Sequence, residues 1–135
     1  MSLQQYAYRV KMQNVKNDFI FKCSEYRNES GVDRLGNDMR FDYWRKFSAL
    51  DDWMRGVYLA KGGTDNFNLH PVRLTEKDLD NLYVAVQSLD FYKGRYNYNE
   101  PQRKKEEEYD HLMKFITKAR RAIDEGDAVY YDNWW

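Results

Sequence analysis

Residues 43–54, "YWRKFSALDDWM", place two tryptophans around an adjacent arginine and lysine, namely Trp44, Arg45, Lys46 and Trp53. Aromatic planes stack on flat rings, and guanidinium and ammonium groups form charge-assisted hydrogen bonds to anions. The combination predicts a site for a small anionic, nucleotide-like ligand. Other residues that could close such a pocket are Asn68, Arg95, Tyr130, Tyr131, Trp134 and Trp135.

Two further interpretations fit the same residues. In the first, the rings widen the buried face of a helix, and the Lys46 stem lies along that face. In the second, the aromatic and basic side chains are exposed and bind a protein partner, because Trp, Tyr and Arg dominate protein-binding hot spots. The residue types alone leave these alternatives open.

No catalytic, metal or cofactor site is predicted from the sequence. A Gly-rich phosphate loop after a strand is missing, and His70 and His111 lack metal-ligand spacing to another His or Cys. We expect surface or structural roles for both histidines and a buried, inert thiol for Cys23. Asp51 and Asp52 diverge by about 100° on a helix, which is poor geometry for two carboxylates that share one catalytic task, and we expect both to be solvated. An enzyme built from distant carboxylates and tyrosines is a third hypothesis.

Composition predicts one packed, aromatic-rich domain over residues 1–135. Hydrophobic residues make up 42% and aromatic residues 17%, which is too apolar for a disordered chain. The 22 basic and 22 acidic residues cancel, so we do not expect binding to nucleic acid or an anionic membrane. The single cysteine fits a reducing cytoplasm, and we expect no secretion signal or membrane span. A homo-oligomer is left open.

Alternating patterns predict the strands. Residues 5–13 alternate apolar and polar side chains, and 19–23 form a short β-rich run that we expect to pair with 5–13 as a hairpin. Residues 26–38 are polar and predict a surface loop. Residues 67–74 alternate again, and Pro71 restricts them to a sheet edge or a bulge. The aromatic tail after residue 127 predicts a docked, extended segment.

Apolar stripes with three- and four-residue steps predict three helices. The first begins at Tyr43, with the stretch 43–54, and ends at the glycines after Lys61, and the second covers 76–89 behind a Thr75–Asp78 capping box. After an aromatic connector at 90–100, the third starts at Pro101 and stops at Gly126. The predicted fold is therefore α+β, with a small antiparallel or mixed sheet of about four short strands packed with three helices.

The order of these motifs resembles a family of small proteins from tailed bacteriophages and prophages. The motifs are "MSLQQYAYRV", "YWRKFSALDDWM", "KGG", "RLTEKDLDNL" and "KARRAIDEGDAVYYDNWW", which together span nearly the whole chain. Members of that family commonly start with Met-Gly/Ser-Leu-Asp-Met-Tyr, carry a Tyr-Trp-Arg-Lys…Leu-His-x-Trp block, and end in Tyr-Tyr-Asp-x-Trp-Trp. Here Asp51 stands at the family's histidine, and "FYKGRYNYN" replaces its Thr-Ser-Gly-Phe-Phe-Phe-Gly connector.

The resemblance implies a cellular role rather than a reaction. It implies a phage accessory protein that acts in the host bacterial cytoplasm, in host takeover or against a host defence. Joined to the aromatic and basic cluster, it leads us to expect non-catalytic binding, and sequestration, of a nucleotide-like ligand. The alternative is an interaction module that binds and inhibits a host protein through an aromatic patch.

Overall fold

The computed structural model describes residues 3–21, 40–64, 66–67, 70–88, 91 and 102–135. A four-stranded antiparallel sheet lies at its centre, in the order β4 (Arg40–Arg45), β1 (Gln4–Lys11), β6 (Asp127–Trp134) and β5 (Val72–Leu74). A 3-10 turn (Met12–Asn14) connects β1 to a small ribbon of β2 (Val15–Asn17) and β3 (Ile20–Phe21). The predicted α+β class and the extended tail are confirmed, and the tail is a central strand.

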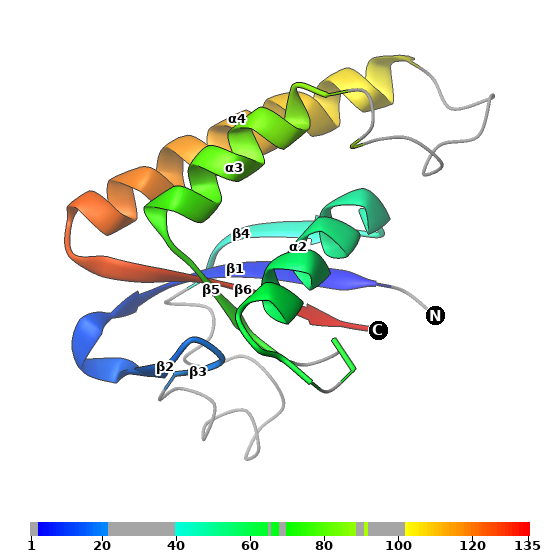
Figure 1. The fold of residues 1–135 in the computed structure, drawn as a ribbon. Helices are drawn as coiled ribbons and strands as arrows, with labels where there is room; N and C mark the ends of the chain where they lie inside the picture. The colour runs from blue at the N-terminus through cyan, green and yellow to red at the C-terminus, as the bar shows by residue number, and fades with distance from the viewer. Residues whose placement is uncertain (1–2, 22–39, 65, 68–69, 89–90, 92–101) are drawn as a thin grey trace.

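The turn of the ribbon lies against the edge strand β5, where Arg73 N donates to the Asp18 carbonyl, and three helices cover one face of the sheet (Figure 1). They are α2 (Ser48–Ala60), α3 (Glu76–Val86) and α4 (Gln102–Asp124). Buried side chains from all three helices join the helix-facing sheet residues Ala7, Val72 and Tyr131 in the main core. A smaller cluster on the opposite face contains Tyr8, Val10, Ala128 and Tyr130.

Local signals predict where α3 begins and where α4 stops, but α3 ends at Val86 and not at the predicted residue 89. Thr75 and Asp78 exchange side-chain and backbone hydrogen bonds, which is the predicted capping box of α3. Gly126 has φ +95°, a left-handed conformation that suits glycine after the end of α4. Strand β5 follows Pro71 and lies at a sheet edge, as predicted. The predicted loop at 26–38 lies outside the described residues, as does nearly all of the connector at 90–100.

The start of the first helix was predicted wrongly. Residues 40–45 form strand β4, in which Tyr43 pairs with Tyr6 and Trp44 with Gln5, and the helix begins only at Ser48. The apolar steps from Tyr43 to Phe47 suit a helix, but strand pairing sends Trp44 and its neighbours to opposite faces. Trp44 is consequently buried against the helices, whereas Tyr43 and Arg45 lie on the opposite face.

The predicted hairpin between 5–13 and 19–23 is also wrong. Strand β3 pairs with β2, because β4 and β6 occupy the two edges of β1. Both of these partners are distant from β1 in the sequence. A short apolar run such as 19–23 carries no information about which strand it will pair with.

A buried polar network joins α2 to the middle of the sheet. The Tyr131 hydroxyl donates to Asp51 Oδ1 at 2.7 Å and accepts from Gln5 Nε2 at 3.0 Å. Asn133 Nδ2 also donates to Asp51 Oδ1, at 2.8 Å. Asp51 is only 4% exposed, so the expectation that it is solvated is wrong. Burial raises the pKa of Asp51, although the bonds from Tyr131 and Asn133 act in the opposite direction.

Removing the Tyr131 hydroxyl will test this network. Tyr131→Phe leaves the buried Asp51 carboxyl with one donor fewer, and we expect the free energy of unfolding to fall by about 1–3 kcal/mol. Tyr83→Phe on the exposed side of α3 is the control and should change it by less than about 0.5 kcal/mol. Urea unfolding of both variants measures the difference. Equal effects of the two substitutions would contradict a stabilising role for the network.

Candidate ligand-binding site

The sheet divides the residues that the sequence suggested for one site. Trp44 and Tyr131 lie on the helix-covered face, whereas the register places Arg45, Tyr130 and Trp134 on the opposite face. Trp53 lines a separate cavity of about 510 Å³ with residues of α2 and α3, and Trp135 lines a third cavity of about 350 Å³. Asn68 and Arg95 lie outside the described residues.

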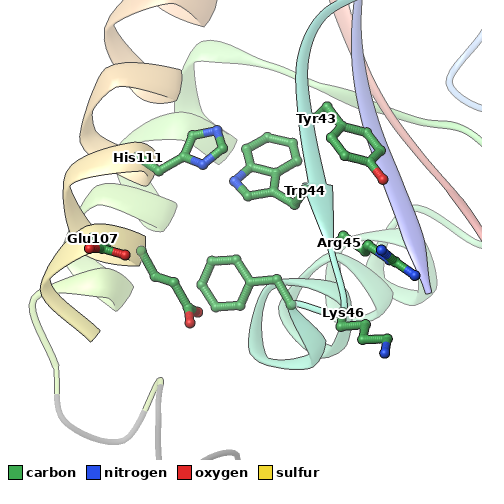
Figure 2. Close-up of a pocket in the computed structure, with 8 residues that line it drawn as sticks. Tyr43, Trp44, Arg45, Lys46, Glu107 and His111 are labelled. Carbon is green, nitrogen blue, oxygen red and sulfur yellow. The ribbon is translucent and has the colours of Figure 1, made fainter. Parts of the chain in front are cut away.

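A cavity of about 390 Å³ lies where β4 turns into α2, opposite α4 (Figure 2). Five consecutive residues of β4 and the turn, 43–47, line one side of the cavity, and α4 supplies three more side chains. The full lining is Tyr43, Trp44, Arg45, Lys46, Phe47, Glu107, Glu108 and His111. The cavity therefore brings together Trp44, Arg45 and Lys46 of the predicted set and adds two carboxylates and an imidazole.

The turn between β4 and α2 is held by a glutamine on the central strand. Gln5 Nε2 donates to the Phe47 carbonyl at 2.9 Å, and Phe47 N donates to Gln5 Oε1 at 2.8 Å. Lys46 N donates to the Leu3 carbonyl at 2.9 Å. Lys46 itself has φ 57°, a left-handed conformation that costs a non-glycine residue about 1–2 kcal/mol. Such strain is often found at functional sites, and here it directs the Lys46 side chain at the cavity rim.

Trp44 forms the inner wall of the cavity. Its indole is 4% exposed, stacks on the His111 ring at a centroid distance of 5.1 Å, and meets Phe115 edge-on at 5.0 Å. The indole Nε1 is buried and has no hydrogen-bond partner among the residues that the structure describes. An unpaired buried N–H of this kind costs about 1–3 kcal/mol, so an acceptor from a ligand would stabilise it.

The imidazole of His111 is held from behind by a buried carboxylate. His111 Nε2 lies 2.6 Å from Asp42 Oδ1, and the Asp42 side chain is only 6% exposed. Lys118 Nζ lies 3.1 Å from Asp42 Oδ2 in an ion pair. Burial raises the pKa of Asp42, but the hydrogen bonds with His111 and the Tyr43 amide outweigh it, so the pKa lies below its ordinary value.

Charge is divided between the two sides of the cavity. In Figure 2 the side chains of Arg45 and Lys46 point away from α4 toward the outer rim, whereas Trp44 and His111 face one another. Glu107, together with its neighbour Glu108, lies on the α4 side. The arrangement suits a flat ligand with hydrogen-bond donors on its ring and a negative group outside the cavity.

His111 and the two glutamates were not predicted as site residues. Glu107 and His111 are four residues apart and so share one face of α4, which is a signal that the sequence does contain. The sequence does not show that this face lies opposite β4. The expectation of a surface or structural role for His111 is met in part, because its ring packs on Trp44 while also lining the cavity.

Within the described ranges, no group of three or more His, Cys, Asp or Glu residues could hold a metal ion. In the same part of the chain, no helix is both long enough and apolar enough to cross a membrane.

Comparisons of this chain with protein-family models, with curated proteins and with solved structures gave no match.

The lowered pKa of Asp42 predicts a pH-dependent contribution to stability. Because the folded pKa lies below the unfolded value of about 3.9, the contribution is fully present above about pH 4 and is lost as the pH falls through the folded pKa. Asp42→Asn should therefore lower the free energy of unfolding at pH 6, and the difference from wild type should shrink toward pH 3. Urea unfolding across this range is the measurement. A difference that stays constant with pH would contradict the assignment.

Proposed function

We propose that this chain is a non-catalytic binding protein for a small, flat, anionic ligand of the nucleotide type. The observation that carries the proposal is the buried, unpaired Nε1 of Trp44 at the wall of the 390 Å³ cavity. A ring nitrogen or carbonyl oxygen of a base would accept from this N–H. Because Nε1 is fully buried and the His111 ring stacks on the indole, an acceptor reaches this N–H only when the His111 ring moves aside.

The division of charge supports one orientation of the ligand. The base lies in the inner part of the cavity against Trp44 and His111, where Glu107 or Glu108 accepts from an exocyclic amine. The phosphate lies at the rim near Lys46 and Arg45. Lys46 is suited to this task because its ammonium has no ion-pair partner within the described part of the chain, and ammonium groups bind phosphate as point charges.

The resemblance to small phage and prophage proteins supports a biological role for this binding. We propose an accessory protein that acts in the host bacterial cytoplasm and holds its ligand so that a host defence or a host pathway no longer receives it. Sequestration requires tight binding and no turnover. A partly enclosed base with charge-assisted phosphate contacts provides affinity without any catalytic group.

A second candidate function is binding and inhibition of a host protein. The observation that favours it is the exposure of large aromatic side chains on the sheet face opposite the helices, where Tyr43 is 41% and Trp134 is 51% exposed. Exposed Trp and Tyr side chains are common in protein-binding hot spots. This alternative predicts a host polypeptide, and no small molecule, on the protein purified from infected cells.

Two substitutions in the cavity test ligand binding. Trp44→Phe keeps a ring but removes the N–H donor, and Lys46→Gln removes the charge at the rim. We expect each to weaken binding of nucleoside 5′-monophosphates about tenfold or more, because each removes a hydrogen bond to a polar or charged group. Isothermal titration calorimetry with the four common ribonucleotides is the measurement.

Trp53→Phe is the matched control, because it makes the same change in a different cavity. Thermal melting of all three variants will show whether they remain folded. Native mass spectrometry of protein from phage-infected cells will identify any ligand that is carried through purification. Wild-type affinity in both cavity variants, or no binding of any of the nucleotides, would refute the proposed function.

A further inference from the structure

A second aromatic surface adjoins the cavity on the other side of the sheet. Arg45 and Trp134 both pair with Gln4, from its two sides, so the three side chains form a row on the face opposite the helices. Tyr43 lies on the same face, and its hydroxyl donates to Gln4 Oε1. We call these four residues, Gln4, Tyr43, Arg45 and Trp134, the sheet-face ledge.

The ledge is aromatic, positively charged and partly rigid. The Tyr43 ring lies 5.4 Å from the Tyr6 ring, and the Arg40 guanidinium is 5.1 Å from the Tyr6 centroid and 6.0 Å from that of Tyr43. These contacts hold Tyr43 in place. Asp132 lies on this face opposite Tyr6, and its carboxylate is buried and accepts from the Asn133 amide.

The cavity and the ledge share two residues. Tyr43 and Arg45 line the cavity and also belong to the ledge, so the cavity rim where we place a phosphate continues onto the ledge. Trp134 lies two strands from Arg45, which is roughly 10 Å at the usual strand spacing. Trp134 is 51% exposed, so part of its side chain is accessible to a ligand.

We propose that the ligand is a dinucleotide. One base occupies the cavity, the linking phosphate lies at Arg45 and Lys46, and the second base stacks on Trp134. Bases stacked in a helix are about 3.4 Å apart, so these two bases are splayed, as proteins that recognise single strands require. This inference rests on the proposed function and names its ligand class. It needs only one or two phosphate contacts, which agrees with the zero net charge of the chain.

A length series of ligands tests the proposal. The probes are adenosine 5′-monophosphate, the 5′-phosphorylated adenylyl dinucleotide and the corresponding hexanucleotide, and the measurement is calorimetric titration. Stacking of the second base should make the dinucleotide bind about tenfold to a hundredfold more tightly than the mononucleotide. The hexanucleotide should bind no more than a few-fold more tightly than the dinucleotide.

Trp134→Ala should remove the gain from the second nucleotide and leave mononucleotide affinity as in wild type, because Trp134 does not line the cavity. Tyr83→Ala is the matched control, since Tyr83 is a comparably exposed ring on α3, and it should preserve the gain. Mononucleotide binding without any gain for the dinucleotide would overturn this inference alone.

Four other outcomes are decisive. A gain that survives in Trp134→Ala overturns the inference, as does affinity that continues to rise with length toward the hexanucleotide, which would indicate a polymeric nucleic acid. Absence of binding by every probe overturns this inference and the proposed function together. Loss of the gain in Trp134→Ala but not in Tyr83→Ala supports the dinucleotide site.

Discussion

The buried hydrogen bonds of Gln5 and Tyr131 are the constraint on which the rest of the structure depends. They lie between the two central strands and α2, where the Tyr131 hydroxyl and Asn133 Nδ2 both donate to Asp51 Oδ1. Buried polar groups are costly unless each has a partner, so this network stabilises the observed placement of α2 on the sheet. The aromatic core then packs around α2, whose position is stabilised by the hydrogen bonds to Asp51.

The same glutamine also shapes the cavity. Its amide binds the N–H and the carbonyl of Phe47, so the turn from β4 into α2 cannot shift without breaking two buried bonds. Lys46 is therefore held in a left-handed conformation that it would not adopt alone. Strain at the rim is therefore offset by buried hydrogen bonds in the core.

The sheet places the aromatic and basic side chains of β4 on its two opposite faces. Consecutive side chains of β4 point to opposite faces, so Trp44 enters the cavity while Tyr43 and Arg45 reach the far surface. Strand β4, six residues long, thereby contributes side chains both to the cavity and to the opposite face of the sheet. A helix at this position would have placed the same residues around one axis and produced neither surface.

The sequence by itself determined the features that depend on neighbours along the chain. The capping box at Thr75, the apolar stripes of α3 and α4, the stop at Gly126 and the α+β class are all visible in it, because helices and caps bond residues that lie three or four positions apart. Two features of the sheet are visible only in the tertiary structure: residues 40–45 form a strand, and β1 pairs with β4 and β6. The same is true of the burial of Asp51 and of the stacking of His111 on Trp44. Those outcomes depend on contacts between residues that lie far apart in the sequence, such as Tyr8 with Arg40, 32 positions away, and Gln4 with Trp134, 130 positions away. No local pattern encodes which distant partner a polar group or a strand edge will find.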